Sequence, residues 1–134
     1  MTIGELYKAA ENAGAEIIVG DFSYNKSMSI LDNEGKTHIA LHNHFETTAD
    51  ERVHLAHEIG HCVRGAFYNI YSSLDARGKH ERRADEWAIM HLVPKARFFA
   101  ACRRGAVYPY QIAEEFNITA QFAEKAMKYY LGEV

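Results

Sequence analysis

The residues best suited to chemistry are His57, Glu58 and His61, which form a His-Glu-x-x-His pattern inside a segment that should be helical. Two histidines four positions apart in a helix are offset by about one turn, so both imidazoles leave the same face and can reach one zinc ion. Glu58 follows the first histidine directly, which places its carboxylate beside the metal. There it can take a proton from water on the metal, as general base, and return it later as general acid.

The flanks of this motif make a metal site a more specific interpretation than the five residues alone would allow. The neighbouring positions are uncharged or apolar, and they include Val53, Leu55, Ala56, Ile59, Cys62 and Val63. A helix that is apolar nearly all round, yet carries two histidines and a glutamate, is typical of a buried helix with a polar site in it. The alternative is a core helix whose histidines are only hydrogen-bonded.

A third metal ligand is expected from a second helical segment, which ends before Pro94. Ala84 and Trp87 belong to its apolar stripe, and Glu81 lies on that stripe three residues before Ala84. Burying an unpaired carboxylate is costly, so this acid needs a partner, and a metal ion is one. With the two histidines it makes a ligand set that leaves a fourth position open for water. The alternative is an ion pair between Glu81 and a neighbouring lysine or arginine.

Short strands are predicted ahead of the motif helix. Residues 15–19 are apolar, and the runs 28–31 and 38–41 flank a turn rich in Asp, Asn and Gly, which indicates a hairpin. His42 and His44 follow the second run and are possible metal ligands. A histidine pair two residues apart more often faces solvent or ends a strand, and we favour that role here.

Helix boundaries follow from the capping residues. Thr2 and Glu5 predict a capping box for an N-terminal helix. Thr48 and Glu51 predict a second capping box at the start of the motif helix, which should end just before Gly65.

The rest of the chain predicts one irregular segment and several helices. Residues 66–79 mix aromatic and small polar side chains and suggest a loop or short strand that could cover the site as a flap. Pro94 should occupy the first position of a further helix. Two short amphipathic helices are predicted at residues 110–116 and 120–131, the second of them capped by Thr119. Together they look like a helix-turn-helix pair.

Composition and charge narrow the function classes. The 134 residues carry a net charge of −3 with a pI of about 6.2, so there is no basic footprint for nucleic acid or an anionic membrane. The length suits a single domain over residues 1–134. We find neither a run long enough for a membrane span nor a signal-peptide core, and the two cysteines should be reduced thiols. These features predict a cytoplasmic protein.

The motifs together resemble those of the ImmA/IrrE family of metallopeptidases. Leu55–His61 reads L-A-H-E-I-G-H, where the family shows L-A-H-E-L-G-H. Glu81–Ala88 matches E-x-x-A-N/D-x-F-A, with Trp87 in place of the usual phenylalanine, and Leu92–Pro94 reads L-V-P where the family shows L-L-M-P. The resemblance covers residues 36–94, and it extends to the helical tail.

This resemblance implies a fold and a division of the chain. The expected class is α+β: a zincin-like core in residues 1–94, with a small twisted sheet packed beside the motif helix, and a C-terminal helical part in residues 95–134.

The resemblance also assigns roles to the site residues. It makes His57, His61 and Glu81 the ligands of Zn²⁺ and Glu58 the catalytic acid and base. Asp85 would hold one of the ligand histidines through its outer ring nitrogen. For the oxyanion partner the sequence offers three candidates without choosing among them, Tyr68, Tyr71 and His80.

The function implied by the resemblance is cleavage of a helix-turn-helix repressor, often one encoded nearby on a phage or mobile element. The strand at residues 38–41 could then pair with an extended segment of the substrate. Two alternatives stay open: a module that binds its repressor without cleaving it, and a DNA-binding regulator acting through residues 110–131. An intact Glu58 argues against the first alternative, and the acidic net charge argues against the second.

Overall fold

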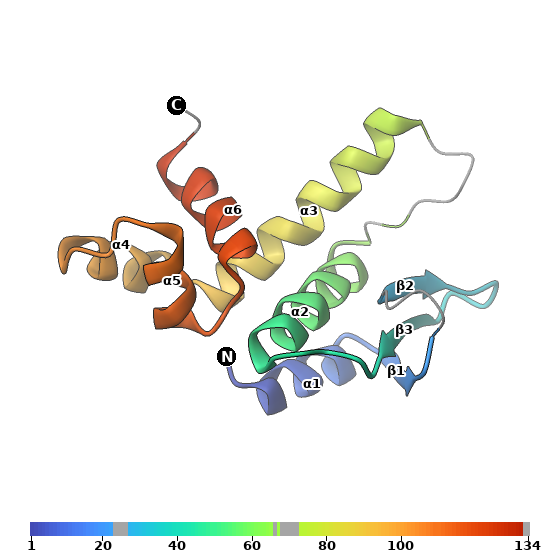
Figure 1. Ribbon diagram of the computed structural model, residues 1–134. Coiled ribbons are helices and arrows are strands. Elements are labelled where there is room, and N and C mark those ends of the chain that lie inside the picture. The colour runs from blue at the N-terminus through green and yellow to red at the C-terminus, as the bar shows by residue number, and fades with distance from the viewer. Residues whose placement is uncertain (23–26, 66, 68–72, 133–134) are drawn as a thin grey trace.

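The structure is a computed structural model that describes residues 1–22, 27–65, 67 and 73–132. In chain order the described residues form α1 (Ile3–Asn12), β1 (Ala15–Gly20), β2 (Met28–Leu31), β3 (Thr37–His42), α2 (Thr48–Arg64), α3 (Leu74–Leu92), α4 (Lys95–Arg103), α5 (Pro109–Phe116) and α6 (Ala120–Leu131). Figure 1 shows α2 in the middle of the molecule, with the sheet to one side and α5 and α6 to the other. The predicted α+β class, with a small sheet beside the motif helix, is confirmed.

The sheet has the strand order β1-β3-β2. β2 and β3 are antiparallel and form the predicted hairpin, whereas β1 pairs with β3 in parallel. At the hairpin turn Asp32 Oδ1 accepts hydrogen bonds from the backbone N–H groups of Glu34 at 2.8 Å and Lys36 at 2.9 Å. Gly35 has a φ of +80°, which favours glycine at that position of the turn.

The position of β3 corrects one prediction. Because β3 pairs with β1 on one side and, at residues 37–40, with β2 on the other, residues 38–40 of the predicted segment have no free edge with which to bind a substrate strand. Within the described residues, the strand next to α2 that keeps a free edge is β2.

One face of the sheet packs on the helices. Successive side chains of a strand point to opposite faces, so Ile39 and Leu41 of β3 lie on the same face. Both are buried in a core cluster that includes Leu6 of α1 and Leu55 and Ile59 of α2. This core fixes the helix that carries the His-Glu-x-x-His motif.

A glycine allows α3 to approach α2 closely. A Cβ atom built on Gly60 would lie 2.5 Å from the carbonyl oxygen of Ala84 and 3.0 Å from its Cα. The first distance is shorter than real Cβ contacts, the second is at the tight end of them, and the atoms in the way belong to the backbone. Gly60 precedes His61, and Ala84 follows Glu81 by three residues, so this contact holds the two helices together beside the candidate ligands.

The cap of α2 is one residue earlier than predicted. The Thr47 hydroxyl, not that of Thr48, accepts the hydrogen bond from the Asp50 backbone N–H at 3.1 Å. The end of the helix agrees with the prediction, since Gly65 adopts the left-handed conformation with a φ of +62°. The first helix has the predicted capping box of Thr2 and Glu5.

This correction gives a paired test of stability. Replacing Thr47 with alanine leaves an N-terminal N–H of α2 without its partner and should lower the free energy of unfolding by about 1 kcal/mol. Thr48→Ala keeps the cap and should change it by less than about 0.5 kcal/mol. Denaturant titration of the two variants measures both values, and equal losses would show that Thr47 is not the cap.

Two further boundaries differ from the prediction. Residues 74–79 belong to α3 and are helical rather than irregular, with Ser73 as the cap. Pro94 is the cap of α4 rather than its first residue. Of the rest of the expected flap, residues 66 and 68–72 lie outside the described residues. The two C-terminal helices are present as predicted, and Thr119 caps α6.

A buried arginine joins α2 to the C-terminal helices. Arg52 donates hydrogen bonds to the carbonyl oxygens of Asn117 at 3.0 Å and Phe116 at 3.3 Å, and a further one to that of Met1. The turn between α5 and α6 is therefore attached to the helix that carries the motif.

Among the described helices, none is long and apolar enough to cross a membrane.

Candidate metal centre

Three side chains that could hold a metal ion converge between α2 and α3. His57 Nε2 lies 2.8 Å from Glu81 Oε2, His61 Nε2 lies 3.0 Å from Glu81 Oε1, and the two Nε2 atoms are 3.1 Å apart. The ligand atoms of the three residues all lie within 4.8 Å of one another. The structure thus brings together His57, His61 and Glu81, the residues expected as ligands from the sequence.

The geometry suits a tetrahedral zinc ion. Ligand atoms at about 2.0–2.1 Å from zinc are about 3.3 Å apart from one another in a tetrahedral site. The two Nε2 atoms, 3.1 Å apart, are near that separation, and each lies 2.8–3.0 Å from a different oxygen of Glu81. Two imidazole nitrogens and one carboxylate also form a donor set that zinc accepts, and three protein ligands leave one position for water.

Asp85 fixes the orientation of His57. It lies on α3 one turn after Glu81, and its Oδ1 is 2.8 Å from His57 Nδ1. An ionised carboxylate can only accept, so Nδ1 carries a proton, and once Nε2 has lost its own proton the ring would present the Nε2 lone pair to a metal ion. Burial raises the pKa of Asp85, but its hydrogen bond to His57 and the charges of His57 and Lys125 outweigh that effect and hold the pKa below its usual range.

Glu58 is buried beside the three candidate ligands. Its side chain is 6% exposed, and burial raises its pKa against the opposing charges of His57 and His61. The hydroxyl of Ser29 on β2 donates to Glu58 Oε1 at 3.2 Å. A buried carboxylate that accepts a hydrogen bond from Ser29 and has a raised pKa is suited to accept a proton and release it again.

Proton competition makes the pH dependence of metal binding predictable. Burial lowers the pKa of His57, but the hydrogen bonds to Asp85 and Glu81 outweigh it and raise the pKa to about 10. Without metal, His57 is therefore protonated at neutral pH, whereas a metal ion binds only the neutral ring, so binding must release this proton.

We expect the apparent zinc affinity to fall by at least about tenfold per pH unit as the pH is lowered from about 8 to about 6. Competition with a chelator of known pH dependence measures this slope. An affinity that does not change over the range would show that no proton is displaced from His57.

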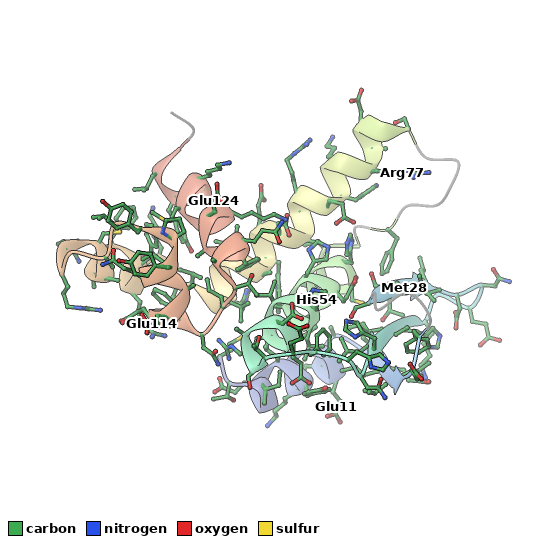
Figure 2. All side chains as sticks on the ribbon, viewed as in Figure 1. Glu11, Met28, His54, Arg77, Glu114 and Glu124 are labelled. Atoms are coloured by element: carbon green, nitrogen blue, oxygen red, sulfur yellow. The ribbon has the colours of Figure 1, made fainter. Side chains whose placement is uncertain are left out.

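The site opens into a cleft of about 960 Å³. β2 contributes residues 28–31 to one wall, and α6 contributes Gln121, Phe122 and Lys125 to another. Glu58 and the candidate ligands lie between these walls, on α2 and α3. In the view of Figure 2, His54 on α2 lies between Met28 on β2 and Glu124 on α6. The cleft is large enough for a short segment of polypeptide.

Three other histidines, His42, His44 and His54, lie outside the group of candidate ligands found among the described residues. His54 lines the cleft one turn before His57, and its Nε2 is 3.4 Å from Asp50 Oδ1. His42 is buried, with its ring centre 5.7 Å from that of His54, and His44 is paired with Asp21. Neither His42 nor His44 belongs to the metal-binding group found among the described residues.

Sequence reasoning missed two residues at the site, Ser29 and Lys125. Ser29 could have been suspected, because it is a polar residue within a strand run, but its partner could not. The Nζ of Lys125 on α6 lies 3.2 Å from Asp85 Oδ2.

Of the three oxyanion candidates, Tyr68 and Tyr71 lie outside the described residues, and His80 is not among the described residues that line the cleft.

Comparison with known proteins identifies the family of the chain. Residues 10–128 match the IrrE N-terminal-like domain of the peptidase M78 family, a stretch that contains every residue of the candidate centre. A solved structure of a Mycobacterium tuberculosis transcriptional regulator shares the fold with a TM-score of 0.63 at 15% identity, covering 96% of this chain and 42% of that one. The chain therefore spans less than half the length of that regulator. A comparison with curated proteins found no match. On the family match, the chain belongs to the IrrE N-terminal-like domain family of M78 peptidases.

Proposed function

We propose that this chain is a zinc-dependent endopeptidase whose substrate is a helix-turn-helix transcriptional repressor. The observation that carries the proposal is the convergence of His57, His61 and Glu81 beside the buried carboxylate of Glu58, at a cleft. Membership of a peptidase family supports the reaction class. When bound, zinc supplies a Lewis acid that polarises the scissile carbonyl and lowers the pKa of a water molecule.

The residues of the chain would carry out the proton transfers and hold the reacting groups in place. Glu58 takes the proton from the attacking water and delivers it to the leaving amine, a role for which its raised pKa suits it. Ser29 holds one oxygen of Glu58 through its hydroxyl. Asp85 keeps the Nε2 lone pair of His57 directed at the metal.

The free edge of β2 gives an extended substrate a place to bind. Residues 27–31 line the cleft, and among the described residues β2 pairs with a strand, β3, on one side only. An extended segment added along this edge would run past Glu58, because Ser29 in the middle of β2 contacts that residue. The strand-addition hypothesis therefore moves from β3 to β2. Hydrogen exchange that slows in residues 28–31 on substrate binding would support it, and unchanged exchange there would count against it.

The choice of a repressor as substrate rests on the resemblance of the motifs to the ImmA/IrrE family. The non-cleaving alternative needs only a binding surface, and it gives no reason for a buried carboxylate held by Ser29 beside a metal-binding group. The DNA-binding alternative would use α6 as the recognition helix, but residues 121, 122 and 125 of that helix line the cleft.

The test is incubation of the zinc-loaded protein with a helix-turn-helix repressor encoded beside its gene, followed by mass spectrometry of the products. We expect cleavage at one defined bond, loss of cleavage on chelation and recovery when zinc is returned. Stable binding of the intact repressor without cleavage, in the zinc-loaded state, would favour the binding module instead. Neither binding nor cleavage would remove the repressor from the proposal.

A further inference from the structure

We propose that Lys125 is a positioning residue that couples helix α6 to the metal ligand His57 through Asp85. This inference rests on the zinc site of the proposed function but not on peptide cleavage. It gives the C-terminal helix pair a role at the metal centre. None of the sequence motifs predicts that role.

The carboxylate of Asp85 bridges two distant parts of the chain. Its Oδ1 is 2.8 Å from His57 Nδ1 on α2, and its Oδ2 is 3.2 Å from Lys125 Nζ on α6. The side chain of Asp85 is 20% exposed, whereas that of Lys125 is 53% exposed. Each oxygen of a largely buried carboxylate thus has its own donor, and together the two donors restrain its rotation.

The contact lies where α6 meets the cleft. Arg52 attaches the turn before α6 to α2, and near the other end of α6 the hydroxyl of Tyr130 donates to the carbonyl oxygen of Val93 at 2.6 Å. Between these two attachments, Gln121, Phe122 and Lys125 form the α6 wall of the cleft. Lys125 therefore connects the α6 wall of the cleft to Asp85, which contacts the candidate ligand His57.

Charge in the cleft gives this lysine a specific role. Four carboxylates line the cleft among the described residues, namely Asp50, Glu58, Glu81 and Asp85. In the same described lining, Lys125 is the only lysine or arginine. Removing its charge would take away the donor to Asp85 Oδ2, so the hydrogen bond to His57 would be less firmly held. The ligand His57 would then be less well oriented for zinc.

Coupling between two sites is reciprocal. If Lys125 orients His57 for zinc, then zinc, by fixing His57 and Asp85, must also restrain α6. The same contact should therefore be visible as a change in metal affinity and as a change in the exchange of α6 amides.

Zinc affinity, measured by competition with a chelator, tests the coupling in the full chain. Lys125→Met keeps the aliphatic stem and removes the charge, and we expect about two- to fivefold weaker binding, the range for a partly exposed ion pair. Lys125→Arg should restore the affinity. The matched control is Lys128→Met, on the same helix, whose lysine faces Glu124 at 4.0 Å with both side chains largely exposed. The control should leave the affinity unchanged.

A double-mutant cycle shows whether the effect passes through Asp85. Asp85→Ala, which removes the acceptor for the His57 Nδ1–H, should weaken zinc binding by about 10–100-fold, and Lys125→Met should add nothing in that background. Zinc should slow hydrogen exchange in α6 of the wild-type protein more than in Lys125→Met.

Equal effects of Lys125→Met and Lys128→Met would overturn the proposal, and so would a Lys125→Met effect that persists unchanged in the Asp85→Ala protein. Zinc binding with the expected cycle but without repressor cleavage would leave this inference standing and remove the peptidase. A wild-type protein unable to bind zinc would remove both.

Discussion

Replacing Glu58 with glutamine should abolish peptide cleavage while leaving zinc bound. Glutamine has the shape of glutamate and can still accept the hydrogen bond from Ser29, so the local packing is preserved. It cannot take a proton from water at neutral pH. General acid and base catalysis is worth about 10²–10⁴-fold, and we expect kcat/KM to fall by that factor.

A matched control makes the result specific to the cleft. Glu51→Gln is the same chemical change on the same helix, but Glu51 lies outside the cleft and contacts Tyr7. This variant should keep its cleavage rate. Zinc content and melting temperature of both variants should equal those of the wild type. Undiminished cleavage by Glu58→Gln would remove Glu58 from its catalytic role.

Replacing Gly60 with alanine should damage both the fold and the metal site. The added methyl group would lie 2.5 Å from the carbonyl oxygen of Ala84, so α2 and α3 must separate to accept it. Overpacking of this kind lowers the free energy of unfolding by about 1–3 kcal/mol or more, because the atoms forced together belong to helix backbone and not to a flexible side chain. Glu81 is on the displaced helix, so zinc should bind more weakly as well.

Gly4→Ala is the control for this change. Gly4 also lies inside a helix, but the nearest atom to an added Cβ is 3.9 Å away. Alanine favours helix over glycine by up to about 1 kcal/mol, so this variant should be as stable as the wild type or more so. Thermal unfolding with and without zinc compares the two. A Gly60→Ala protein with unchanged stability and zinc affinity would contradict the close packing of the helices.

The candidate centre could be predicted largely from the sequence because its parts are local. The spacing of His57 and His61 fixes two ligands on one helix face, and the apolar stripe around Glu81 marks an acid that needs a partner. The capping box at Thr2 and the hairpin turn around Asp32 are likewise set by neighbouring residues. Each of these features needs only a few consecutive residues to be recognised.

What could not be predicted depends on contacts between distant segments. Ser29 reaches Glu58 only because β2 is the edge strand beside α2, and the parallel pairing of β1 with β3 that puts it there has no local signal. Lys125 is 40 residues from its partner Asp85, on a helix whose docking angle is set by packing. Thr47 and Thr48 are adjacent and chemically equivalent as caps, so only the helix geometry chooses between them.

The zinc content of the purified wild-type protein, determined by elemental analysis beside that of Glu81→Ala, tests the central claim most directly. The control is Glu86→Ala, which removes an acid on the same helix that is not among the described residues lining the cleft. We expect a single zinc ion per chain in the wild type and in the control, and little or none in Glu81→Ala. Zinc retained in full by Glu81→Ala, or absent from the wild type even after reconstitution, would contradict the three-ligand centre on which the proposed function depends.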